Sequence, residues 1–166
     1  MLFILNMRSK LNIVLINNYL SMKSHDLEKY AFMWNQARLV VAALSLIFGG
    51  FPLIYRLFST STPLVGPILT LFWIVSGVSA AYLLYLFVQG GKRLWGGKNR
   101  TDLIAFAIAV GSGLHLGITG LTGMNIGMRV LPYGVLPLIM LVAGAAYLWA
   151  AFYLYKKQKA NPIMFG

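Results

Sequence analysis

Long uncharged stretches alternate with short polar and basic segments along this chain. Runs without Asp, Glu, Lys or Arg cover residues 39–55, 57–91, 103–128 and 130–155. A helix that crosses the hydrocarbon core of a bilayer needs about 20 mostly apolar residues, and the second run is long enough to contain a turn as well. The pattern therefore predicts four transmembrane helices, at about residues 39–58, 67–89, 102–122 and 130–155.

The segment before the first predicted span has a different pattern. Over residues 22–38, apolar side chains such as Leu27, Tyr30 and Trp34 recur at helical spacing, with polar residues largely elsewhere. This predicts an amphipathic helix that lies in the headgroup region and leads into the first span. The alternative is that these residues are the frayed start of that span. Residues 1–21 are predicted to be an extension that the working protein lacks, with translation starting near Met22.

Composition agrees with a membrane protein. The 166 residues are 59% hydrophobic and only 10% charged, whereas soluble domains are about 25% charged. The chain contains no cysteine, which excludes disulfides, thiolate nucleophiles and cysteine-ligated metals. We therefore predict an all-α, polytopic membrane protein. Its fold is a four-transmembrane-helix bundle over residues 39–155, preceded by the N-terminal amphipathic interfacial helix.

The basic residues predict the orientation of the bundle. Of the 14 Lys and Arg residues, all but Arg56 and Arg129 flank the predicted spans on one side. The positive-inside rule then places the N-terminus, the middle loop and the tail at 156–166 in the cytoplasm of a multi-pass cell-membrane protein. The same placement explains the net charge of +11 without a nucleic-acid partner.

The middle loop, GGKRLWGGKNR, contains two Gly-Gly-Lys units. A phosphate-binding P-loop needs Gly, four residues and then Gly-Lys-Ser or Gly-Lys-Thr, and this loop does not match that motif. We expect its basic side chains to contact anionic lipid headgroups instead. The residues assigned to this contact are Lys92, Arg93, Lys98 and Arg100.

The third predicted span carries small residues at close to four-residue spacing. Such a stripe lets two helix backbones approach closely, so this face should pack tightly against another helix. That helix could belong to the same chain, which is the commoner arrangement, or to a second copy or a partner protein. The helix-packing residues are Ala105, Ala109, Gly113, Gly117 and Gly120.

The opposite face of the same span is polar. Ser112, His115, Thr119 and Thr122 follow one another at helical spacing and form a candidate polar path. His115 is the one ionisable side chain well inside a predicted span, and such residues are costly to bury. It could serve as a proton relay, as a haem or quinone ligand, or as a substrate contact. The alternative is a neutral histidine that donates to Ser112 or to a nearby carbonyl.

Two function classes remain. With no buried carboxylate, no cysteine and one membrane histidine, catalysis has few groups to use, so we do not expect an enzyme. No cofactor or metal is expected, since haem would need a second axial histidine and His25 lies in the interfacial segment. The leading hypothesis is a non-enzymatic membrane subunit that packs against other membrane proteins or itself through the third span and supports assembly of a larger complex. The alternative is a small transporter or channel that uses the polar path.

Overall fold

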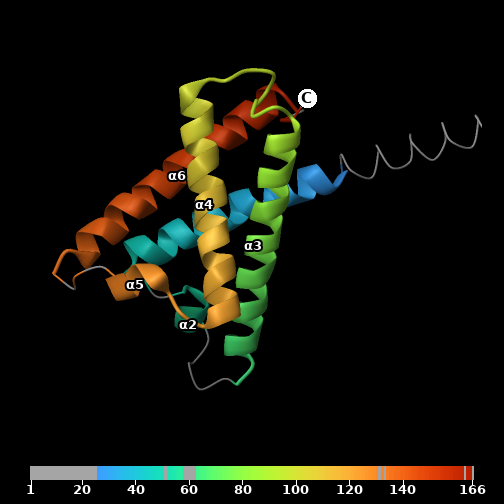
Figure 1. Ribbon diagram of the computed structural model, residues 1–166. Coiled ribbons are helices and arrows are strands. Elements are labelled where there is room, and N and C mark those ends of the chain that lie inside the picture. Colours follow the sequence, from blue (N-terminus) through green and yellow to red (C-terminus); the bar gives the residue numbers. More distant parts are fainter. Residues whose placement is uncertain are drawn as a thin grey trace, which may run out of the picture.

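The computed structural model describes residues 26–50, 52–57, 63–130, 132, 134–162 and 164–165. Within these residues the regular structure is helical (Figure 1). Four helices are long and apolar enough to cross a membrane, which confirms the predicted all-α fold with four such helices. The predicted extension at residues 1–21 and the start near Met22 lie outside the described residues. The helices are the N-terminal helix Asp26–Ile47, α2 Ile54–Leu57, α3 Val65–Gln89, α4 Arg100–Thr122, α5 Ile126–Val130 and α6 Leu136–Ala160.

The first long helix differs from its prediction. It runs without a break from Asp26 to Ile47, so the expected border between residues 38 and 39 falls inside it. Turns at Gly49 and Gly50, both with positive φ, follow the helix, and the expected span over 39–58 therefore ends early. The sequence predicts that border at Arg38 because a charged residue usually marks the membrane surface. The interfacial location of residues 22–38 stays a prediction.

The other long helices lie near their predicted positions. Helices α3 and α4 match the expected spans at 67–89 and 102–122 closely, whereas α6 begins and ends later than the expected 130–155. Pro132 and Gly134 are not helical, so the helix expected from residue 130 begins only at Leu136. Pro137 falls in the first turn of α6, where the backbone N–H that it lacks would have no acceptor within the helix. At the other end, Lys157 and Lys159 prolong the helix, since cations are favourable near a helix C-terminus.

Helices α3 and α4 form the central antiparallel pair, and the N-terminal helix and α6 cross this pair obliquely (Figure 1). The loop between α3 and α4 and the C-terminal residues lie at the same end of the molecule. We call this end the basic end, because Lys92, Arg93, Lys98, Arg100 and the lysines of the last α6 turn gather there.

The small-residue stripe of α4 is used within the chain. A Cβ atom added at Gly117 would lie 2.6 Å from the Cα of Gly77 on α3, and one at Gly113 would lie 2.6 Å from the Cβ of Ala80. Gly120 faces α3 residues in the same way, and Ala105 and Ala109 are buried. The stripe therefore brings two helices of one chain together, which is the commoner of the two expected arrangements.

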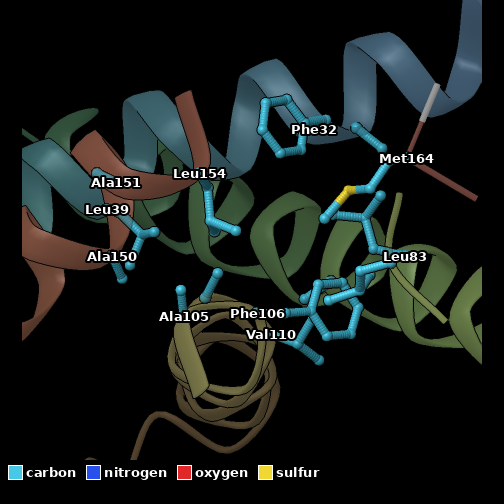
Figure 2. Close-up of a cluster of buried hydrophobic side chains, with 14 residues drawn as sticks. Phe32, Leu39, Leu83, Ala105, Phe106, Val110, Ala150, Ala151, Leu154 and Met164 are labelled. Atoms are coloured by element: carbon cyan, nitrogen blue, oxygen red, sulfur yellow. The ribbon is translucent and has the colours of Figure 1, made fainter. Parts of the chain in front are cut away.

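A hydrophobic core lies between the long helices (Figure 2). Its residues from α3 and α4 belong to the halves of these helices that are next to the basic end. The core joins all four long helices, and Met164 from the C-terminal segment is 1% exposed within it. Phe165 also packs there, edge-on against Phe106 at 5.9 Å between ring centroids. The predicted tail at 156–166 thus begins as helix and ends as part of the core. The residues labelled in Figure 2 are Phe32, Leu39, Leu83, Ala105, Phe106, Val110, Ala150, Ala151, Leu154 and Met164.

Replacing Gly117 with Ala should destabilise the α3–α4 pair. The added methyl group meets the Gly77 backbone, and overpacking of this kind costs about 1–3 kcal/mol. Gly111→Ala is the matched control, because nothing lies within 4 Å of its added Cβ. It should stabilise α4 by up to about 1 kcal/mol, since Ala is the better helix former. Thermal unfolding in one detergent measures both. Equal effects of the two variants would contradict the packing described here.

Candidate functional site

A cavity of about 780 Å³ lies between the N-terminal helix, α3, α4 and α6. Apart from Trp34, the N-terminal helix contributes residues from its C-terminal half, as does α4, whereas α3 and α6 contribute residues from their N-terminal halves. Because α3 runs antiparallel to α4, these stretches all lie in the half of the bundle away from the basic end. The bundle is therefore closed by a packed core in one half and hollow in the other.

The cavity wall is mostly apolar, with a few polar groups. Aromatic and aliphatic side chains such as Phe72, Trp73 and Ile139 form most of the lining. A wall of this kind with a small number of polar groups is typical of sites for organic ligands. The polar lining residues are Arg38, Ser45, Ser76, Ser112, His115, Thr119, Asn125 and Tyr147.

Arg38 is the charged side chain among the described residues that line this cavity, and it is 8% exposed. Its Nη1 donates to Ser112 Oγ at 3.1 Å, and its Nη2 donates to Ala109 O at 2.6 Å and to Asn35 Oδ1 at 3.0 Å. Ala109 and Ser112 lie near the middle of α4, and Arg38 lies near the middle of its own helix. The guanidinium is thus at mid-length of the bundle, at the floor of the cavity.

No carboxylate side chain of the protein neutralises Arg38. The chain has three acidic residues, Asp26, Glu28 and Asp102, all of them described. Asp26 and Glu28 lie on the same helix as Arg38, about 18 and 15 Å away along its axis at 1.5 Å per residue. Asp102 pairs with Lys157. Burying an ion without its counterion costs several kcal/mol even after relaxation. The burial of Arg38 at this position therefore destabilises the folded bundle.

Neighbouring side chains hold Arg38 in position. Asn35, which accepts from the guanidinium, donates to Ser79 Oγ at 3.0 Å and to Ala31 O at 2.9 Å, so its amide is fixed. Trp34 donates from Nε1 to Ser76 Oγ at 3.2 Å and stacks on Phe72 with ring centroids 5.4 Å apart. These contacts anchor the N-terminal helix to the middle of α3.

Three of the four residues of the expected polar path line the cavity. Ser112 accepts from Arg38 and donates to Ala109 O at 3.0 Å. His115 Nε2 lies 3.3 Å from Asn125 Oδ1, and Thr119 Oγ1 donates to His115 O at 2.9 Å. Thr122 is exposed outside the cavity lining and donates to Ile118 O at 2.7 Å. His115 Nε2 thus lies against a side chain just before α5. A neutral histidine that donates to Ser112 or to a nearby carbonyl stays one of the two predicted alternatives. Passage of a solute along these residues stays a prediction.

Sequence reasoning missed Arg38, although a signal was present. Asn35, Arg38, Ala42 and Ser45 follow one another at steps of three, four and three residues, which places them on one face of a helix. The polar face of α4 has the same spacing. The pattern becomes visible once the helix is continued through residue 38, because the predicted border between residues 38 and 39 divides these four residues into two segments.

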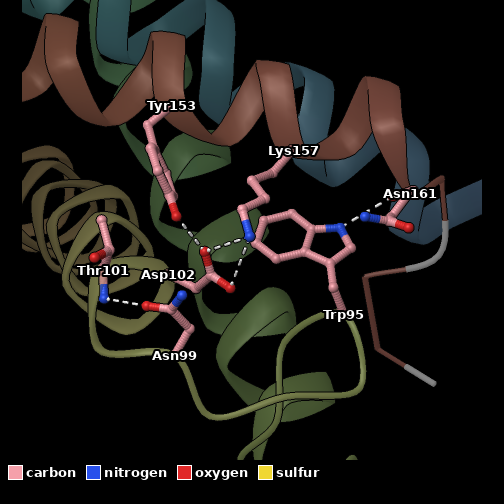
Figure 3. Close-up of polar contacts among 7 residues, drawn as sticks. All are labelled: Trp95, Asn99, Thr101, Asp102, Tyr153, Lys157 and Asn161. Atoms are coloured by element: carbon pink, nitrogen blue, oxygen red, sulfur yellow. Dashed lines mark hydrogen bonds and ion pairs between the residues drawn. The ribbon is translucent and has the colours of Figure 1, made fainter.

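The basic end is organised by a second polar cluster (Figure 3). Asp102 is 3% exposed, so the expectation of no buried carboxylate is wrong. It accepts from Tyr153 Oη at 2.6 Å and pairs with Lys157 Nζ at 3.3 Å. Trp95 donates from its backbone N to Met164 O at 2.8 Å and from Nε1 to Asn161 O at 3.0 Å. The middle loop is therefore fastened to α6 and to the C-terminal segment.

The predicted lipid-contact residues lie on this loop. Lys92, Arg93, Lys98 and Arg100 are all exposed, whereas Leu94 between them is buried. Positive φ values at Lys92 and Trp95 turn the loop back on itself, and Leu94 pairs with Gly97. The basic side chains thus project from a compact loop. Their contact with anionic headgroups stays a prediction.

Comparison with known proteins gives the site no assigned chemistry. No family model, no curated protein and no solved structure matches this chain. The function of the cavity therefore has to be inferred from its own side chains.

Asp102→Asn should loosen the basic end. The amide loses the charge that attracts Lys157 and one of its oxygen acceptors, and loss of a hydrogen bond to a buried charged group costs about 1–3 kcal/mol. Asp26→Asn, at an exposed carboxylate, is the matched control and should stay within about 0.5 kcal/mol. Protease cleavage of the C-terminal segment, followed over time, reports the loosening. Equal cleavage of both variants would contradict the anchoring role of Asp102.

Proposed function

We propose that the protein is a small membrane transporter that binds its solute in the cavity between the four long helices. The observation that supports this function is the division of the bundle into two halves. One half holds a cavity with polar groups along its walls, and the other is sealed by the packed core and the C-terminal segment. A solute site near mid-membrane, accessible from one side at a time, is the arrangement that transport requires.

The geometry supports this function better than that of an assembly subunit. A partner helix would need the small-residue stripe of α4, and that face is occupied by α3 of the same chain. The subunit hypothesis stays a prediction, and its test is whether another membrane protein co-purifies in gentle detergent. The cavity, by contrast, needs no partner to be complete.

We further propose that the basic end faces the cytoplasm of a cell membrane. Arg38 lies inside the bundle and no longer counts toward this orientation, but the exposed basic residues of the middle loop and of α6 still favour it. The cavity would then lie in the outer half of the membrane. In the conformation described here, the transporter would present its site toward the outside.

Transport can be tested with three probes that share a hexyl chain and differ in charge. These are 1-hexanesulfonate, hexyltrimethylammonium and hexyl glucoside, each followed into proteoliposomes by rapid filtration. At least one should enter faster than in protein-free liposomes. Ala143→Phe, which places a ring in the cavity, should reduce that uptake to the protein-free rate.

Ala145→Phe is the matched control, since Ala145 is exposed on the same helix and does not line the cavity. It should leave uptake unchanged. If no probe enters faster than in protein-free liposomes, or if Ala143→Phe has no effect on the uptake, the cavity is not a transport site.

A further inference from the structure

We infer that the cavity is a site for an amphipathic organic anion, whose acidic head group binds Arg38 and whose apolar body lies against the aromatic and aliphatic wall. This inference names the substrate class of the proposed transporter and rests on that function for its physiological meaning. The binding site itself can be tested separately.

The charge of Arg38 requires an anion. Its three acceptors, Ser112 Oγ, Asn35 Oδ1 and Ala109 O, are all neutral. They satisfy hydrogen bonds but leave a full positive charge in an apolar interior, and the carboxylate side chains of the chain lie elsewhere. An anionic ligand would supply the missing counterion, and burial would strengthen the attraction between the two charges.

The guanidinium also has donors to spare. Arginine carries five N–H donors, and three of them are used in the contacts above. The buried Nε has no acceptor among the described residues. Planar arginine groups with free N–H donors bind carboxylate, sulfonate and phosphate oxygens strongly, because charge and geometry both match. The head group of the ligand therefore belongs to this class of oxyanions.

The wall of the cavity requires an apolar body. Phe72, Trp73, Ile139 and Met140 line the same cavity as Arg38. The cavity, at about 780 Å³, has the size of sites that enclose drug-sized organic molecules, and an inorganic ion would leave it almost empty. His115, one helical turn from Ser112 on α4, places a further polar group along the path.

Such an anion has two sources, a soluble molecule with one short tail or an anionic phospholipid of the bilayer. Both offer the same chemistry to Arg38. They differ in whether the ligand is already present in the membrane, so lipid composition separates them in the experiment.

Binding can be measured on the full chain in phosphatidylcholine nanodiscs, with 1-hexanesulfonate as the anionic probe and hexyltrimethylammonium as its cationic match. Isothermal titration should detect the sulfonate and not the ammonium. Methanesulfonate, which has the head group alone, should bind more weakly than 1-hexanesulfonate. Equal binding of anion and cation would overturn the inference.

Arg38→Gln should weaken sulfonate binding about tenfold or more, as expected when a charge-assisted hydrogen bond is lost. Arg38→Lys, which keeps the charge, should retain more affinity than Arg38→Gln. Arg93→Gln is the matched control at an exposed loop position and should bind like the unmodified protein. Unchanged binding in a folded Arg38→Gln protein would overturn the inference.

A second variant keeps the test decisive if Arg38→Gln does not fold. Ala42 lines the cavity one helical turn from Arg38, so Ala42→Glu would supply an internal carboxylate as counterion. This variant should fold and lose sulfonate binding, whereas Ala42→Gln, of the same size but neutral, should keep it. Sulfonate binding that survives in Ala42→Glu would overturn the inference.

The outcomes separate this inference from the proposed function. Sulfonate that binds but does not cross the liposome membrane supports the anion site and contradicts the transporter. Uptake of the ammonium or the glucoside that Ala143→Phe abolishes, without sulfonate binding, supports the transporter and contradicts the anion site.

If phosphatidylglycerol in the nanodiscs competes with the sulfonate, the anion is a membrane lipid. If it does not compete, the anion is a soluble molecule. Both of these results support the anion site.

Discussion

The structure depends on how closely α3 and α4 approach each other. Gly77 and Gly117 meet backbone to backbone, without side chains between them. In a bilayer the hydrophobic effect does not drive helices together, because lipid tails are as apolar as the side chains, so van der Waals packing of this kind drives their association. The same approach creates the place for Arg38. A side chain at Gly113 would lie 3.2 Å from Arg38 Nη2, so the glycine leaves the space that the guanidinium occupies beside the α4 backbone. The close packing of α3 on α4 and the burial of the Arg38 guanidinium therefore both depend on the same stripe of small residues.

Among the described residues, the two buried ionic side chains, Arg38 and Asp102, have opposite surroundings. Asp102, at the basic end, has both a cationic partner in Lys157 and a hydrogen-bond donor in Tyr153, and Lys157 remains partly exposed to solvent. Its role is to hold α4 to α6. Arg38, at the floor of the cavity, has good hydrogen bonds but no opposite charge. Its ion pair explains why Asp102 can be buried. Stability does not explain the burial of the unpaired Arg38, and a perturbed charge of this kind in a cavity indicates a ligand site.

The sequence predicted the fold well where hydropathy alone decides it. The bounds of α3 and α4, the glycine stripe and the polar face at Ser112, His115 and Thr119 all follow from residue type and helical spacing. The position of Arg38 could not be predicted in this way. Charge is expected at a membrane surface, and two of the three acceptors of Arg38 lie on α4, more than seventy positions along the chain. The burial of Met164 was missed for the same reason, since its contacts come from Trp95 and the N-terminal helix.

The long sequence distance between Arg38 and its acceptors has a consequence for biosynthesis. The N-terminal helix leaves the ribosome first, and of the four long helices it has the lowest hydropathy, 1.2. Ala109 and Ser112 follow 71 and 74 residues later. Until α4 has been synthesised, the guanidinium has neither of these acceptors and is best solvated by water or lipid headgroups at the membrane surface. The first helix is therefore expected to reach its final depth only after α4 has been made, so its insertion is completed late although its translation comes first.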